Sequence, residues 1–237
     1  MQFDDFAHSY SENAFIQKDL IDWAIPFLDI IPFKNQSIIE LGAGTGLLTK
    51  HLLEKNRGPI LATDSSARMI IEGRRQVPKV DWQFMDAWNA SPNFGHIFSS
   101  SLLQWAPDPR LVIANWAKNL SIGGTIHALF FIDQTLWELR QLISLENRIQ
   151  WQTRSQWEQI FKNAGLEVHL CRDLVKCYKF RSGLDLLKNL KQTGTCLKNS
   201  ICGSYLKKII RDYDKEFSFQ EGVYSTWHFC QIVGIKH

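Results

Sequence analysis

The stretch Ile39-Glu-Leu-Gly-Ala-Gly-Thr-Gly46 decides the fold, because it places three alternate glycines between a short apolar run and a helical pattern. Glycines permit a tight turn with positive φ and let a ligand lie against bare backbone. The helix that follows offers unpaired N–H groups and the positive end of its dipole. The stretch therefore predicts that a nucleotide-like ligand binds where a buried β-strand ends.

Strand and helix patterns alternate on both sides of this loop. Apolar runs predict strands at 37–41, 59–64, 80–85, 96–99 and 125–132. Periodicity and capping residues predict helices at 11–31, interrupted near Pro26, and at 45–55, 67–75, 108–119, 155–164, 183–192 and 204–214. Gly123 and Gly124 are expected to separate a helix from a strand, and Ser155-Gln-Trp-Glu158 has the form of a capping box. The alternation predicts an α/β fold with a doubly wound, mostly parallel sheet that binds its ligand at the carboxyl ends of the strands.

Composition indicates one globular domain. The 237 residues are 45% hydrophobic, which is enough for one sizeable core, and the strongly apolar runs are far shorter than the ~20 residues that cross a bilayer. Acidic Asp4 and Asp5 stand where a signal peptide needs bases, so a cytoplasmic location is expected. The five cysteines contain no C-x-x-C pair and the histidines lack metal-ligand spacing, so neither disulfides nor a metal site are expected.

Positive charge is concentrated in one part of the chain. The net charge is only +3, yet residues 171–215 carry eleven Lys or Arg and four acids, a net charge of +7. Such a stretch is either a solvated helix surface or a docking face for an anionic partner, whose rate of encounter it would raise. RNA is the less favoured partner, because no RNA-binding module accompanies the stretch and the isoelectric point is only moderately basic.

The glycine spacing argues against a dinucleotide. The dinucleotide fingerprint is G-x-G-x-x-G, but Leu47 occupies the third glycine position here. Glu40 would repel a pyrophosphate, whereas it suits the ammonium and sulfonium of S-adenosylmethionine. Asp64 ends the next strand and suits the two hydroxyls of a ribose, and Asp86 with Ala87 suits an adenine. Each acid alone is as readily a helix cap or a solvated loop residue, but the series after three strands favours cofactor binding.

This series resembles the class I S-adenosylmethionine-dependent methyltransferases over residues 37–132. The resemblance implies a Rossmann-like, seven-stranded sheet and S-adenosyl-L-methionine as the cofactor. It assigns Glu40 and the glycines to the methionine end, and it places Ser65 and Met69 beside the nucleoside, although Met69 is equally suited to core packing. The expected cofactor-binding residues are Glu40, Gly42, Gly44, Gly46, Asp64, Ser65, Met69, Asp86, Ala87 and Ser101.

Short segments outside the core are similar to one subfamily, the malonyl-acyl-carrier-protein O-methyltransferases of biotin synthesis. These segments are 6–10 with Gln17, 100–105, 135–139, 186–194 and 226–229. The chain has neither the Asn-Pro-Pro-Tyr tetrad of N-methylating enzymes nor the Pro-Cys nucleophile of cytosine C5 enzymes after the fourth strand. The resemblance implies one domain with an N-terminal helical cap (1–35), a cofactor core (36–132) and helical insertions for substrate and partner (133–154 and 172–222).

The implied reaction needs no general base, because a malonyl carboxylate is already ionised at pH 7 and catalysis rests on alignment. An anionic acceptor calls for a cation, so Arg140 or Arg148 is expected to hold it, with a solvated helix arginine as the alternative for each. The resemblance implies that Tyr10 and Trp105 close over the methyl donor and the thioester, although Trp105 equally suits the core.

The expected partner is an acyl-carrier protein that carries a malonyl group. The protein itself is expected to be a monomer that binds neither nucleic acid nor a membrane. The alternative acceptors are another small carboxylic acid or a quinone precursor, and, less favoured, RNA. A non-catalytic adaptor that binds the cofactor ranks lower still.

Overall fold

The computed structural model describes residues 3–33, 35–90, 94–143, 151–194 and 203–237. One mixed sheet runs through it in the order β3-β2-β1-β4-β5-β8-β6, and the short β7 pairs with the start of β8. The strands are β1 (Ile38–Leu41), β2 (Ile60–Asp64), β3 (Asp81–Phe84), β4 (Phe94–Ser100), β5 (Leu120–Phe131), β6 (Leu166–Phe180), β7 (Ser218–Phe219) and β8 (Gly222–Lys236). Strands β1 to β5 are parallel, and β8 is antiparallel to both β5 and β6. The doubly wound, mostly parallel sheet is confirmed.

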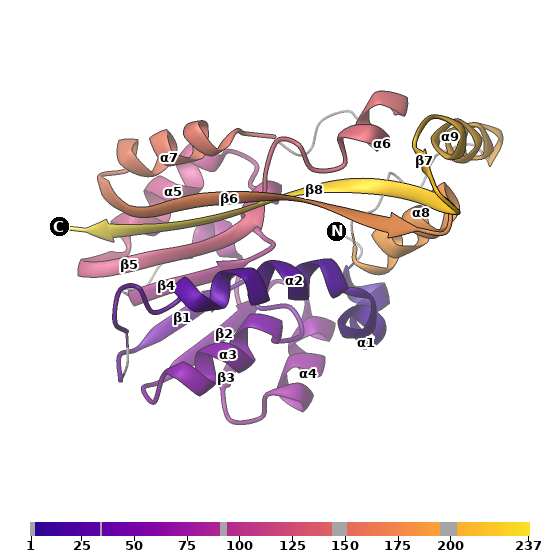
Figure 1. The fold of residues 1–237 in the computed structure, drawn as a ribbon. Coiled ribbons are helices and arrows are strands. Elements are labelled where there is room, and N and C mark those ends of the chain that lie inside the picture. The colour runs from indigo at the N-terminus through magenta and orange to yellow at the C-terminus, as the bar shows by residue number, and fades with distance from the viewer. Residues whose placement is uncertain (1–2, 34, 91–93, 144–150, 195–202) are drawn as a thin grey trace.

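Helices cover both faces of the sheet (Figure 1). They are α1 (Phe3–Asn13), α2 (Phe15–Ala24), α3 (Leu47–Lys55), α4 (Ala67–Gln76), α5 (Pro109–Lys118), α6 (Trp137–Leu142), α7 (Arg154–Asn163), α8 (Gly183–Gln192) and α9 (Gly203–Glu216). Short 3₁₀ turns are η1 (Ile25–Phe27), η2 (Ala87–Asn89) and η3 (Leu103–Trp105). Apolar side chains of α2, α3 and α4 form one core against the sheet, and those of α5 and α7 form a second core on the other face.

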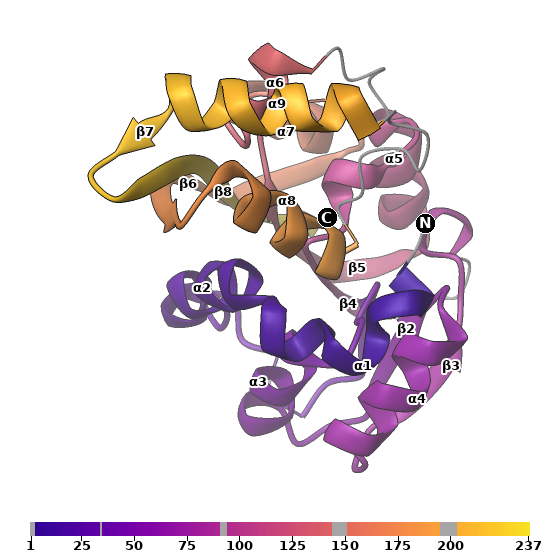
Figure 2. The same ribbon diagram turned by 90° about the vertical axis from the view of Figure 1, so that its right-hand side faces the viewer.

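Helices α1, α6, α8 and α9 gather at the end of the sheet where β5 finishes, and α8 lies between α9 and the pair α1 and α2 (Figures 1 and 2). Two hydrogen bonds tie α1 to its neighbours. The Ser11 hydroxyl lies 2.8 Å from that of Thr45 in the glycine loop, and the Asn189 amide of α8 donates to the Asn13 carbonyl over 3.0 Å. Helix α1 is thereby fixed over the carboxyl ends of the parallel strands, where this class of fold binds its ligands.

The helix expected over 11–31 is wrong in its start and lacks the break at Ala14, whereas its expected interruption near Pro26 coincides with η1. The first helix already begins at Phe3, and the chain leaves helical geometry at Ala14, where ψ is 42°. Ala14 is buried, so the turn is fixed by packing, and α1 runs in a different direction from α2. The apolar pattern alone could not separate the two helices because it continues across the turn.

Three further expectations need correction. Gly123 and Gly124 lie inside β5, where the pairing of β5 with β4 is bulged. The two strands come close there, because a Cβ on Gly124 would lie 2.4 Å from the Gly95 carbonyl oxygen of β4. The capping box of α7 is formed by Thr153 and Gln156, two residues earlier than 155–158. The segment 172–222 is not helical throughout, because β6 extends to Phe180; as the edge strand of the sheet it keeps charged side chains in water, as a helix surface would.

Among the described residues, no helix is both long and apolar enough to cross a membrane. Cys171, Cys177 and Cys230 are free thiols, and Cys196 and Cys202 lie outside the described residues.

Candidate active site

A cleft of about 220 Å³ opens at the carboxyl ends of β1, β2 and β4. It collects most of the residues that the sequence assigns to a cofactor, together with two assigned to catalysis. These lining residues are Tyr10, Gly42, Gly44, Asp64, Ser65, Met69, Asp86, Ala87, Ser101 and Trp105. Glu40 and Gly46, which the sequence also assigns to the cofactor, are not among the lining residues.

The three glycines of the loop are required for different structural reasons. Their φ angles are +70°, +57° and +89° for Gly42, Gly44 and Gly46, all in the left-handed region. A Cβ on Gly42 would strike Leu102 at 2.8 Å, and one on Gly46 would crowd Val77 at 3.0 Å. A Cβ on Gly44 would meet nothing within 4 Å, and this glycine lines the cleft, so a side chain there would occupy the space of a ligand.

Asp64 fixes the loop and faces the cleft. Its two carboxylate oxygens accept from the backbone N–H groups of Gly44 and Ser66, each over 2.9 Å. A carboxylate oxygen accepts more than one hydrogen bond, so Asp64 can position the loop and also accept from a pair of ribose hydroxyls.

Glu40 is a buried carboxyl group with one hydrogen bond, from the Thr49 hydroxyl over 2.6 Å. Burial, aided by the charge of Asp64 and opposed by that hydrogen bond, raises the pKa of Glu40 to about 8. No cation pairs with Glu40 among the described side chains. A ligand that brings an ammonium to this end of the loop would supply the missing charge, so the donor set fits the methionine end of S-adenosylmethionine.

The loop after β3 forms the opposite wall. Asp86 caps η2 by accepting from Trp88 N over 3.0 Å and from the Asn89 amide over 2.7 Å. Ala87 is buried and its carbonyl accepts from the Trp116 indole N–H over 2.7 Å, which holds the turn in place.

Met69 stands at the start of α4, where Ser66 is the N-cap and accepts from Met69 N over 3.1 Å. It is almost fully buried and also lines the cleft, so it serves both of the roles weighed for it.

Five further residues line the cleft that were not predicted to do so, namely Ser66, Met85, Trp88, Ser100 and Leu102. All five flank predicted positions on loops that follow parallel strands. That placement was the available signal, because such loops converge at one edge of the sheet.

A second, smaller pocket of about 30 Å³ adjoins the cleft and shares Tyr10, Ser101 and Trp105 with it. Its other lining residues are Gln17, Gln104, Phe131, Thr135, Leu136, Trp151, Thr193 and Trp227. Ser101 connects the two spaces and has a φ of +55°, a strained conformation for a residue with a Cβ. The pocket is suited to the reacting end of an acceptor, and this second pocket is called the acceptor pocket below.

Tyr10 stands between the two spaces on α1. Burial, and to a lesser degree the nearby charge of Asp64, raise the pKa of the Tyr10 phenol. The hydroxyl is therefore a neutral hydrogen-bond donor at physiological pH and not a base.

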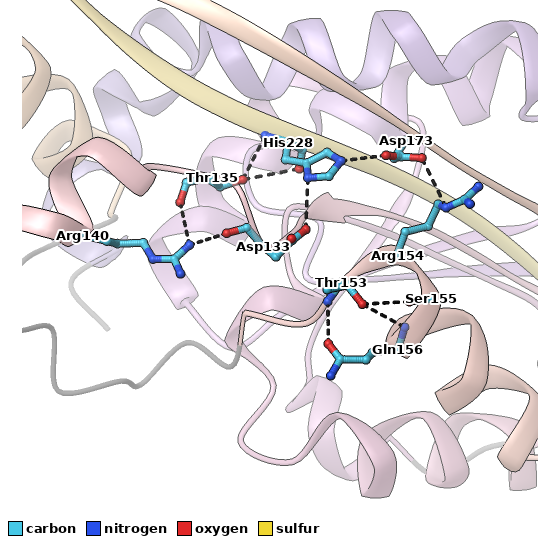
Figure 3. A network of polar contacts seen from close by, with 9 residues as sticks. All are labelled: Asp133, Thr135, Arg140, Thr153, Arg154, Ser155, Gln156, Asp173 and His228. Carbon is cyan, nitrogen blue, oxygen red and sulfur yellow. Dashed lines mark hydrogen bonds and ion pairs between the residues drawn. The ribbon is translucent and has the colours of Figure 1, made fainter. Parts of the chain in front are cut away.

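Arg140 is not part of the lining of the second pocket. Its guanidinium donates to the backbone carbonyls of Asp133 and of the lining residue Thr135 (Figure 3), and it stands 4.9 Å from the centre of the Trp151 ring. Arg148 lies outside the described residues.

The chain matches a family model described as a methyltransferase domain over residues 13–170. The chain belongs to this methyltransferase family. It is an S-adenosyl-L-methionine-dependent methyltransferase, and the site built above fits that cofactor at Glu40, Gly44 and Asp64.

Curated relatives align with nearly the whole methyltransferase. The malonyl-[acyl-carrier protein] O-methyltransferase of Haemophilus ducreyi is 27% identical, covering 96% of this chain and 92% of that protein. The protein of the same name from Bacillus anthracis is 28% identical with the same coverage.

Solved structures share the fold. The YcgJ protein from Bacillus subtilis has a TM-score of 0.66 at 15% identity, over 92% of this chain and 98% of that one. The Streptomyces coelicolor geranyl diphosphate C-methyltransferase, solved with S-adenosyl-L-homocysteine, has a TM-score of 0.59 at 13% identity, over 91% of this chain and 79% of that one.

Proposed function

We propose that this methyltransferase esterifies the free carboxylate of a malonyl thioester carried by an acyl-carrier protein, the reaction that the sequence resemblance assigns to biotin synthesis. The two relatives described above carry that name and align with almost the entire chain, beyond the cofactor core.

One observation carries the choice of a carboxylate. The described lining of the second pocket contains no Asp, Glu, His, Lys or Cys, and its phenol, Tyr10, holds its proton firmly. An alcohol, a phenol or an ammonium would have to lose a proton to a base before it attacked a methyl group. A carboxylate is ionised at pH 7 and attacks without that step. The pocket therefore favours a carboxylic acid over a quinone precursor as the acceptor.

The cofactor supplies a methyl group made electrophilic by its sulfonium. The side chains of this protein align the acceptor with it and exclude water. Tyr10, Ser101 and Trp105 border both the cleft and the pocket, so an acceptor oxygen there lies at the junction of the two. Alignment of this kind can supply several kcal/mol, roughly up to 10 in favourable cases.

The basic stretch supports a protein-borne acceptor. Several of its cations interact within the fold; among them, Lys176 pairs with Asp19 over 2.6 Å and Arg172 stacks on Trp23 at 3.9 Å. The exposed lysines on α8 and α9 are Lys188, Lys191, Lys207, Lys208 and Lys215. Helix α8 ends beside Thr193, which lines the acceptor pocket, so Lys191 in its last turn is near that lining residue. An acidic carrier protein complements them.

Competition between acceptors tests the proposal. Methyl-labelled cofactor is incubated separately with malonyl-carrier protein, acetyl-carrier protein, malonyl-coenzyme A, free malonate, a phenolic quinone precursor and bulk RNA. We expect label on malonyl-carrier protein and none on the acetyl form, which lacks the carboxylate. Equal or faster labelling of a phenolic quinone precursor, or labelling of RNA, would contradict it.

A further inference from the structure

Buried polar atoms without partners gather around the acceptor pocket. Gln17 Oε1, Ser101 Oγ, Gln104 Oε1 and Trp227 Nε1 have no hydrogen bond among the described residues, and all four residues line this pocket. Gln17, Gln104 and Trp227 are only 6%, 5% and 2% exposed. Folded proteins pair nearly all such atoms, so unpaired ones at a pocket point to a ligand. The Ser101 hydroxyl and the Trp227 indole N–H can donate to that ligand, whereas the Gln17 and Gln104 oxygens only accept.

These atoms come from three separate parts of the fold. Gln17 projects from α2, Trp227 from β8, and Ser101 with Gln104 from the loop after β4. The Gln104 amide nitrogen donates to the Ser101 carbonyl over 2.8 Å, which supports the strained backbone of Ser101 and makes Gln104 a positioning residue. Gln17 has no such restraint, so a half-turn of its amide presents N–H groups to the pocket.

The pocket is electrically neutral across its described lining. Arg140, which contacts the lining residue Thr135, donates to backbone carbonyls instead. We propose that the acceptor carboxylate is held by neutral donors, the Trp227 indole N–H and the Gln17 amide with the Tyr10 and Ser101 hydroxyls, and not by a guanidinium. This inference rests on the proposed function, because it takes the acceptor to be a carboxylate.

Neutral donors suit the chemistry of the transfer. One carboxylate oxygen forms the O–CH₃ bond while the C–S bond breaks and its electron pair stays on sulfur; no proton moves. An arginine fork would stabilise the ground-state carboxylate at both oxygens and oppose the loss of its charge, whereas single donors do so less. The neutral ester keeps only weaker hydrogen bonds to the same donors, so the site must bind the acid more tightly than its methyl ester.

The ratio of the two affinities is therefore the informative measurement. Malonyl-pantetheine and its methyl ester are titrated calorimetrically into the full-length enzyme saturated with S-adenosylhomocysteine. We expect the wild type to prefer the acid about tenfold. Trp227→Phe and Gln17→Leu should each lower that preference several-fold, mainly by weakening binding of the acid.

A matched variant separates recognition from structure. Trp157 is equally buried but packs against Phe130 on the opposite face of the sheet, so Trp157→Phe should change stability without changing the acid-to-ester ratio. Binding of S-adenosylhomocysteine shows that each variant is folded, and Gln17→Leu remains informative if Trp227→Phe does not fold.

The outcomes distinguish this inference from the function on which it rests. An unchanged ratio in both Trp227→Phe and Gln17→Leu overturns the inference alone, as does loss of the preference in Arg140→Ala or Arg148→Ala but not in those two variants. A wild type that binds neither malonyl compound refutes the proposed function and this inference with it.

Discussion

Replacement of Glu40 by glutamine should move stability and cofactor binding in opposite directions. Burial raises the pKa of Glu40 from its ordinary 4.5 to about 8, so the native ligand-free protein keeps a proton that the unfolded chain releases between those values. Stability of the wild type therefore falls as the pH rises through this window, by at most about 1.4 kcal/mol per pH unit, or roughly 3 kcal/mol from pH 5 to pH 7. The Glu40→Gln variant lacks this loss.

The cofactor should reverse the order. An ammonium at Glu40 favours the ionised carboxylate, so binding at pH 7 should release about one proton in the wild type. The amide of Glu40→Gln offers only a neutral acceptor, and we expect its affinity for S-adenosylhomocysteine to fall about 10- to 100-fold, the range for a charge-assisted hydrogen bond.

Two measurements check both halves. Thermal unfolding of the ligand-free proteins at pH 5, 7 and 8 should show Glu40→Gln gaining on the wild type as the pH rises. Calorimetry in two buffers of different ionisation enthalpy counts the released proton. Glu54→Gln, an exposed change on α3, is the control and should alter neither. Unchanged affinity in Glu40→Gln, with no proton released by the wild type, would refute the assignment of Glu40 to the methionine end.

Three other predictions follow from local geometry. Gly44→Ala should lower cofactor affinity at least tenfold, because the new Cβ enters the cleft. Gly123→Ala is the matched control, since Gly123 has a similar φ of +75° and its Cβ would also meet no atom within 4 Å. It should lower the stability measured by thermal unfolding by about 1 kcal/mol and leave cofactor affinity intact. Ser101→Gly should relieve strain and raise stability by about 1 kcal/mol, yet lower turnover, since it removes a hydroxyl at the junction of the two pockets. A rise in kcat would contradict the second half. Lys207→Glu with Lys208→Glu should lower kcat/KM for malonyl-carrier protein about tenfold more than for malonyl-pantetheine, in steady-state assays at low salt; equal losses on the two substrates would argue against a docking role.

The fold and the cofactor cleft were largely predictable because their signals are local. The glycines of 39–46 and the acids Asp64 and Asp86 lie at or just after the ends of strands, and parallel strands bring such positions to one edge. Local signals failed where tertiary packing decided the outcome. Gly124 lets β4 and β5 approach closely at a bulge in β5. From the sequence alone, the same glycine pair indicates the end of a helix and the start of a strand.

The acceptor pocket was less accessible to sequence reasoning. Gln17 and Trp227 are far apart in the chain and meet only when α2 packs beside β8, so no spacing rule connects them. The expectation of an arginine came from charge balance alone. In the structure the Arg140 guanidinium donates to backbone carbonyls of the turn after β5, and no periodicity in the sequence predicts those hydrogen bonds.

The most direct test of the central claim is mass spectrometry of malonyl-carrier protein after incubation with the enzyme and methyl-labelled cofactor. The account predicts one added methyl group, on the malonyl moiety and removed by mild alkaline hydrolysis, as an ester requires. An unmodified malonyl group, or a methyl group that survives alkali, would contradict it.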